Sequence, residues 1–225
     1  MTFSVSGRCA DTGMFGIAVS SSSPSVAARC AHVRAGIGAV STQNVTDPRL
    51  GPKGLDLMAG GLSAEAALAR LVAEAPHVEY RQLALVDAEG RTAAFSGAKT
   101  LGTHAFARGN GVVAAGNMLT TTAIPQAMVE AFEAAEGRHL GDRLIAAMRA
   151  AVAAGGEEGP VHSIGLVMVD KVSWNVADLR VDWTEGDPIE ECAALWQRWR
   201  TEMGAYVTRA LDPTRAPSYG VPGDL

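Results

Sequence analysis

The sequence has 225 residues, which is long enough for one large domain and short for two independently folded ones. Hydrophobic residues make up 48% and charged residues 19%, which excludes a disordered chain, and no apolar run approaches the roughly 18 residues of a membrane-spanning helix. A net charge of -5 without a Lys/Arg cluster argues against nucleic acid or an anionic membrane as a partner. We therefore expect one domain over residues 1–211 and a Pro-rich tail over residues 212–225.

The cysteines and histidines do not form a recognisable metal or disulfide pattern. Cys9, Cys30 and Cys192 are scattered without a CxxC motif, and the five histidines are isolated from one another. The spacing of these residues indicates neither a zinc site nor a set of disulfides, so we expect no metal, no cofactor and a reducing compartment. The first residues lack the basic and apolar regions of a secretory signal, so the cytoplasm is the expected location.

The first half of the chain predicts a β-hairpin, one further strand and a helical hairpin. Alternation of polar and apolar residues from residue 2 and an apolar run at 14–19 flank a turn at 10–13. A third strand is expected over residues 36–41. Helices are expected over residues 50–58 and 63–75, the second with Ser63 as its N-cap.

The second half repeats this order of strands followed by helices. Strands are expected over residues 82–86, 92–95 and 111–115, then helices over 122–135 and 140–154, a hairpin of 163–169 with 176–181, and a closing helix over 189–210. The segment 101–110 reads as a loop that shapes a pocket. The strands fall into two groups along the chain, and each group is followed by a pair of helices. This order predicts an α+β sandwich of antiparallel sheets covered by helices.

The familiar motifs of hydrolases, metalloproteases, kinases and dinucleotide-binding proteins are missing from the sequence. The remaining candidate is Thr2, which follows Met1 directly and heads the first predicted strand. If Met1 is removed, the Thr2 hydroxyl gains its own α-amine, whose pKa near 7.7–8.0 suits it to accept the hydroxyl proton. One residue would then supply both nucleophile and base; the alternative is that Thr2 is an ordinary strand residue.

Several segments together resemble the DUF1028 family. They are MTFSVSGR, FGIAVSS, VRAGIGAVSTQN followed by DPRLGPKGLDLM, RQLALVDAEGRTAAFSG and GNML, in the expected order from about residue 2 to about residue 183. The family is grouped with the N-terminal nucleophile (Ntn) hydrolases, although it is named for an unknown function. The resemblance implies a four-layer αββα sandwich.

The resemblance also implies roles for three residues. In Ntn hydrolases the nucleophile heads the first strand, a polar residue follows the second and a basic side chain heads the third; Thr2, Ser21 and Arg34 occupy these places here. An arginine stays protonated under ordinary conditions. Arg34 is therefore expected to stabilise an anion and not to relay a proton.

Other polar residues at predicted strand ends are candidates for the oxyanion site and for substrate binding. Gly116 and Asn117 follow a strand, where an amide or backbone N–H suits an oxyanion donor; the alternative is that they shape the turn. Thr42, Gln43 and Asn44 end the third predicted strand and offer polar groups to a substrate, or else form a polar loop. His162 is a candidate for orienting a substrate carboxylate, or a solvated strand cap.

These residues lead to one main hypothesis and two alternatives. The main hypothesis is a cytoplasmic hydrolase of a small amide, cyclic amide or peptide-like bond, acting through Thr2 without metal or cofactor. The alternatives are a non-catalytic protein of the same fold that binds a small polar metabolite, and a hydrolase that uses Cys9 or an internal serine. A homodimer is also expected, because Cys192, Trp196, Trp199 and Met203 form a stripe that the Pro-rich tail cannot cover.

Overall fold

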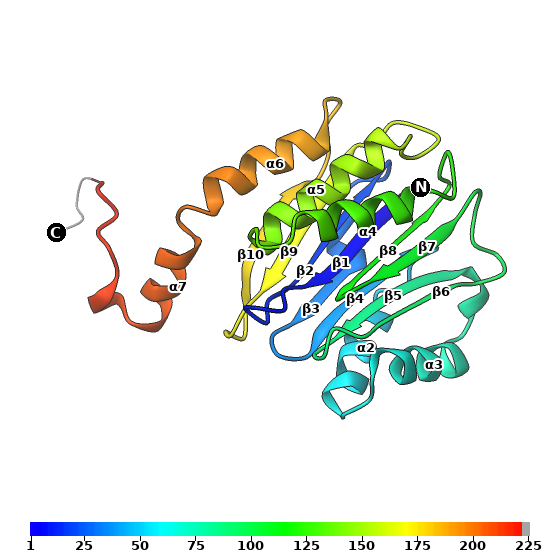
Figure 1. Cartoon of the computed structure of the whole chain (residues 1–225), viewed down its shortest axis with the longest axis horizontal. Helices are drawn as coiled ribbons and strands as arrows, with labels where there is room; N and C mark the ends of the chain where they lie inside the picture. The colour runs from blue at the N-terminus through cyan, green and yellow to red at the C-terminus, as the bar shows by residue number, and fades with distance from the viewer. Residues whose placement is uncertain (222–225) are drawn as a thin grey trace.

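A computed structural model describes residues 1–221 and shows a mixed α+β architecture with two antiparallel sheets (Figure 1). The six-stranded sheet has the spatial order β10 (Asn175–Val181), β9 (Ser163–Val169), β2 (Phe15–Ser21), β1 (Thr2–Arg8), β8 (Val112–Asn117) and β7 (Ala105–Gly109). The four-stranded sheet has the order β3 (Ala31–Arg34), β4 (Gly38–Asn44), β5 (Arg81–Asp87) and β6 (Thr92–Ser96).

Helices lie on the outer face of each sheet (Figure 1). Those on the six-stranded sheet are α4 (Ile124–Ala134) and α5 (Leu140–Ala153), and those on the four-stranded sheet are α2 (Leu50–Ala59) and α3 (Ala64–Glu74). The remaining helical segments are α1 (Ala27–Cys30), α6 (Pro188–Trp199), α7 (Met203–Leu211) and the 3₁₀ turns η1 (Val78–Tyr80) and η2 (Pro213–Arg215). None of the helices within residues 1–221 is long and apolar enough to cross a membrane.

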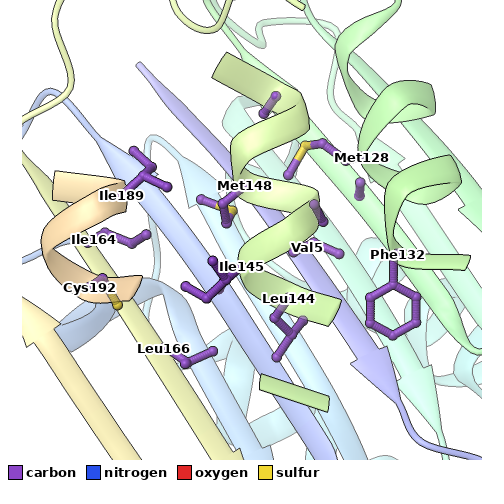
Figure 2. Packing of buried hydrophobic residues seen from close by; sticks show 14 of the residues in the cluster. Val5, Met128, Phe132, Leu144, Ile145, Met148, Ile164, Leu166, Ile189 and Cys192 are labelled. Carbon is purple, nitrogen blue, oxygen red and sulfur yellow. The ribbon is translucent and has the colours of Figure 1, made fainter. Parts of the chain in front are cut away.

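The alternation of β1 decides which of its side chains meet the helices and which face the other sheet. Phe3 and Val5 pack into the core beneath α4 and α5, where Figure 2 shows Val5 under helical side chains such as Leu144 and Met148. Ser4 points the opposite way and reaches Ser41 of the four-stranded sheet, as expected for a strand in which successive side chains alternate. The polar residues of β1 therefore lie between the two sheets.

Most predicted elements are present with shifted ends. The first hairpin, the helical hairpin and the final hairpin are confirmed, and the Ser63 hydroxyl caps α3 by accepting from the Ala66 N–H. The sequence analysis did not predict α1 and β3, which precede the predicted third strand. The loop expected over residues 101–110 is wrong in part, because 105–109 form the edge strand β7.

The closing helix is also wrong as predicted, because it divides into α6 and α7. At the break the Thr201 hydroxyl donates to the Arg198 carbonyl and the Glu202 N–H donates to Trp199. Such local bonds compete with the regular helical pattern.

The aromatic stripe on the closing helix is not left uncovered. Cys192 and Trp196 are fully buried in the core that β9, β10 and α5 share with α6. The indole N–H of Trp196 donates to the Asp142 carboxylate at 2.8 Å, and that of Trp199 to the Val176 carbonyl at 2.9 Å. The expectation that this stripe is uncovered, on which the predicted dimer was based, is therefore wrong. The dimer itself remains a prediction.

Candidate functional site

Three predicted polar residues meet at one end of the six-stranded sheet. The strand register places Thr2 directly opposite Ser21 on one side and opposite Asn117 on the other. Side chains that face each other across an antiparallel pair lie on the same face of the sheet. That face is the inner one, because the Asn117 side chain reaches Gln82 of the four-stranded sheet.

The Thr2 and Ser21 hydroxyls converge on the carbonyl oxygen of Met1. Each donates to that oxygen at 2.5 Å, and the two hydroxyl oxygens lie 3.4 Å apart. Thr2 is only 6% exposed. The candidate nucleophile is thus held beside a peptide carbonyl, while the free α-amine in this chain belongs to Met1.

A line of hydrogen bonds connects this pair to a cation that the sequence analysis missed. The Ser23 hydroxyl lies 2.8 Å from the Ser21 hydroxyl, and the Arg29 guanidinium donates to Ser23 at 2.5 Å. Arg29 also donates to the carbonyls of Pro24 and Ser25, which fix its position. Arg29 lies on α1, so its place near Thr2 depends on a helix that the sequence pattern did not reveal.

Two buried glutamines join the sheets beneath the nucleophile. The Gln43 amide donates to the Gln82 side-chain oxygen at 2.8 Å, and the Gln82 amide donates to the Gly116 carbonyl at 2.9 Å. The Asn117 amide donates to the same Gln82 oxygen at 3.1 Å, and Ser4 donates to Gln43 at 2.6 Å. Gln43 was expected to contact substrate, but its side chain links the two sheets. The sequence analysis missed Gln82, although a polar residue within an apolar predicted strand is a signal that could have identified it.

Thr42 and Asn44 make local contacts instead of facing Thr2. Thr42 is fully buried and its hydroxyl donates to the Asp47 carbonyl. Asn44 has a φ of 72°, a left-handed conformation that asparagine tolerates better than most residues. Its amide donates to the Tyr80 carbonyl at 2.6 Å. Both residues therefore shape the strand end in this structure.

Gly116 and His162 border the cluster through their backbones. A Cβ at Gly116 would lie within 2.8 Å of the Leu119 side chain, so the glycine permits close packing there. The His162 N–H donates to the Ser21 carbonyl at 2.9 Å, but its ring bonds to the Thr184 carbonyl at 2.8 Å. The imidazole is thus engaged away from the nucleophile.

Arg34 is not brought to this end of the molecule. It is the last residue of β3 and pairs with Gly38 at the beginning of β4, whereas Gln43 is near the end of that strand. Its guanidinium forms a largely exposed ion pair with Asp56 at 2.9 Å. The structure gives Arg34 no contact with Thr2.

A buried carboxyl group near the N-terminus was also missed by the sequence analysis. Glu157 is 6% exposed, and within residues 1–221 neither of its carboxyl oxygens has a hydrogen-bond partner. Burial raises the pKa of Glu157 to about 8, and the charge of the Met1 ammonium and the Ser22 backbone N–H act in the opposite direction. Its acidic neighbour Glu158 is exposed, so the sequence alone offered no way to distinguish the two.

Other features of the structure lie away from Thr2. Across residues 1–221, no three His, Cys, Asp or Glu side chains gather as a metal site would require. A cavity of about 400 Å³, lined by Arg8, Glu89, Glu133 and Arg143 among others, lies at the opposite end of β1. Cys9 follows Arg8 at that far end and is buried, which separates it from the polar cluster.

The chain belongs to DUF1028, a family of unknown function, whose family model matches residues 2–192. Its fold is shared with protein SPO2555 from Silicibacter pomeroyi, assigned to the same family, which is 27% identical and has a TM-score of 0.80 over 88% of each chain.

Two more distant structural matches are Anbu (ancestral beta-subunit) proteins. That of Yersinia bercovieri is 9% identical, with a TM-score of 0.41 over 91% of this chain and 97% of its own. A mutant of that from Hyphomicrobium sp. strain MC1 is 10% identical, with a TM-score of 0.39 over 98% of this chain and 100% of its own. No curated protein matches the chain.

Proposed function

We propose that this protein is a cytoplasmic amidohydrolase of the N-terminal nucleophile type, acting through Thr2 on a small amide, cyclic amide or peptide-like bond. The observation that carries the proposal is the place of the Thr2 hydroxyl. Thr2 is the first residue of a central strand, and its side chain lies on the inner face of the sheet. Its hydroxyl and that of Ser21 both donate to the Met1 carbonyl, which belongs to an amide. The proposed domain is residues 1–211, with Thr2 at one end of the sandwich.

The proposed reaction needs Met1 to be removed, so that Thr2 carries the free α-amine. That amine accepts the hydroxyl proton as the Thr2 oxygen attacks the amide carbon, and then passes the proton to the leaving amine. An ester forms on Thr2 as the C–N bond breaks, and water then hydrolyses the ester. This cycle uses no metal and no organic cofactor.

Ser21 and Asn117 are the proposed donors to the oxyanion. Ser21 donates to the Met1 carbonyl oxygen, and the substrate carbonyl is proposed to take the same position. Asn117 faces Thr2 across β1 and β8, where its second amide hydrogen is a candidate donor. Arg29, acting through Ser23, takes the place that the sequence assigned to Arg34 as the supporting cation.

Mass spectrometry after exposure to a β-lactone tests the proposal. We expect the intact mass to show loss of one methionine, and peptide mapping to place the acyl group on Thr2. Thr2→Ala should abolish labelling, Thr2→Ser should retain part of it, and Thr12→Ala, at an exposed threonine of the first turn, should label normally. Retained Met1 with no acylation would favour the non-catalytic alternative, and acylation of Cys9 would favour a thiol nucleophile.

A further inference from the structure

Met1 occupies a defined space beside the nucleophile, which we call the Met1 seat and define by Thr2, Ser21, Glu157 and Gly159. The Met1 carbonyl accepts from Thr2 and Ser21. Its side chain lies against Gly159, where an added Cβ would come within 3.0 Å of the Met1 Cε. The charge of its ammonium lowers the pKa of the Glu157 carboxyl, although the two groups form no ion pair. The carbonyl and the side chain of Met1 thus contact different parts of the protein, and its ammonium acts electrostatically on a buried carboxyl.

The backbone holds Glu157 firmly at this place. Glu157 forms an isolated β-bridge with Leu119, just after the end of β8. On the next residue, the Glu158 N–H donates to the Met118 carbonyl at 3.1 Å. The backbone at Glu157 is therefore held by the same loop that follows Asn117.

The state of the Glu157 side chain indicates a missing partner. A buried carboxyl without hydrogen bonds carries a desolvation cost, and Glu157 is 94% buried with both oxygens unpartnered among the residues that the structure describes. A cationic N–H donor offsets that cost best, because charge-assisted hydrogen bonds are the stronger kind. In the chain with Met1 removed, the Met1 ammonium no longer supplies this charge.

We infer that the Met1 seat receives the acyl half of the substrate and that Glu157 binds its α-ammonium group, so that the substrates are amides of amino acids with a free α-amine. This inference rests on the proposed function, because it places the substrate carbonyl beside Thr2. The Thr2 nitrogen and hydroxyl oxygen share one Cα–Cβ unit, so an acyl group on the oxygen lies next to the position of Met1. Gly159 leaves room for an unbranched side chain.

The proposed reaction needs only Thr2, the substrate and water. The ester bond forms between the Thr2 oxygen and the aminoacyl carbon, and the amide C–N bond breaks. The hydroxyl proton moves to the Thr2 α-amine and then to the leaving amine, while the substrate α-ammonium keeps its own protons. Water then releases the free amino acid.

The test compares two coumarin amides on protein whose loss of Met1 has been verified by intact mass. The probes are L-methionine 7-amido-4-methylcoumarin and its N-acetyl derivative. We expect the wild type to favour the free amine on the order of 10²-fold in kcat/KM, because truncating one partner of a buried charged pair costs that much or more. Glu157→Gln should remove most of this preference, whereas Glu158→Gln, the exposed neighbouring acid, should keep it.

A binding measurement separates failure of the inference from failure of the proposed reaction. Calorimetry on Thr2→Ala, with Met1 removed, should detect L-methioninamide and not N-acetyl-L-methioninamide, and adding Glu157→Gln should abolish the difference. Such binding to Thr2→Ala, together with no turnover of either coumarin amide by the wild type, would support the inference and refute the hydrolysis. Equal turnover of both coumarin amides, unchanged preference in Glu157→Gln, or no binding of L-methioninamide would overturn the inference.

A second variant tests the inference independently, in case Glu157→Gln does not fold. Gly159→Val narrows the Met1 seat without touching a charge. We expect it to lower kcat/KM for the methionine amide at least about tenfold relative to the glycine amide, since a steric block depends on side-chain size. Equal loss for both amides would contradict the placement of the substrate side chain.

Discussion

Asn117 is the residue whose proposed role is easiest to separate from a structural one. Its amide donates to Gln82 between the two sheets, so it has a structural contact as well as its proposed catalytic role. If it also donates to the oxyanion, Asn117→Ala should lower kcat by a factor on the order of 10² to 10³ with little change in KM. Steady-state kinetics and melting temperature should be measured together.

The control for this variant is Asn175→Ala, which removes an exposed asparagine on β10. It should leave both turnover and stability nearly unchanged. An Asn117→Ala protein that is destabilised by about 1 kcal/mol but retains full turnover per folded molecule would assign Asn117 to structure alone.

Glu157 should make stability depend on pH in a direction opposite to that of a salt-bridged carboxyl. Its pKa is about 8 in the folded chain and 4.5 ordinarily, so between these values the folded state holds a proton that the unfolded state has lost. The free energy of unfolding should therefore fall as pH rises through this window, by at most about 1.4 kcal/mol per pH unit. Urea denaturation of chain that retains Met1, at pH 5 and pH 8, measures this.

Glu157→Gln cannot lose this proton, so its stability relative to wild type should increase from pH 5 to pH 8. Glu158→Gln should follow the wild type at both values. Parallel pH dependence in the wild type and Glu157→Gln would show that the buried carboxyl does not titrate in this range.

The candidate site could be predicted from sequence only where it is built from strand ends. Thr2, Ser21 and Asn117 come together because three adjacent strands share one register. Arg29 and Glu157 approach Thr2 through a short helix and a loop, and such placements depend on tertiary packing. Arg34 was misplaced because no pattern revealed that β3 runs away from the site.

Asp87 joins a β-turn to helix α3. Its carboxylate accepts from the Ala64 N–H at the start of α3 and from the Arg91 N–H and guanidinium. Burial alone would raise the pKa of Asp87, but these hydrogen bonds outweigh it and the pKa is lowered. Asp87→Asn should therefore cost about 2 kcal/mol, since hydrogen bonds to a charged group are worth roughly 1.5–3 kcal/mol.

Chemical denaturation at neutral pH measures this loss. The matched change is Glu89→Gln in the same turn, where the carboxylate forms an exposed ion pair with Arg91. That pair should contribute less than about 1 kcal/mol. A similar cost for both variants would mean that Asp87 does not anchor α3.

The elements that the sequence predicted well are those with a regular pattern and a clear boundary. The hairpin of α2 and α3 has apolar periodicity and a capping serine, and both signals are local. The edge strand β7 has only five residues, with Phe106 exposed, so its pairing with β8 and not its own pattern defines it. The break after α6 likewise depends on side-chain contacts at Thr201.

In the molecule as a whole, α7 is a peripheral helix. It has no buried residue, packs mainly on β10 and η2, and extends away from the sandwich (Figure 1). Its Leu211 is 64% exposed. We therefore expect a homodimer in which the α7 face is covered, with a light-scattering mass near twice the 23.3 kDa of one chain.

Leu211→Asp should shift this dimer toward monomer while changing the stability of the single chain by no more than about 0.5 kcal/mol. Thr208→Asp, on the same helix, tests whether the effect is specific to the apolar position. A mass near 23.3 kDa for the wild type over a wide concentration range would rule out the dimer.

The line of hydroxyls from Arg29 to Thr2 has a fixed polarity. A guanidinium only donates, so Ser23 accepts from Arg29, and because the single Ser21 proton goes to the Met1 carbonyl, Ser23 must donate to Ser21. Every proton in the line therefore points inward, toward the oxygen beside Thr2. A reacting carbonyl at that place would meet a dipole already oriented for negative charge, maintained from the surface by one arginine that never touches the substrate.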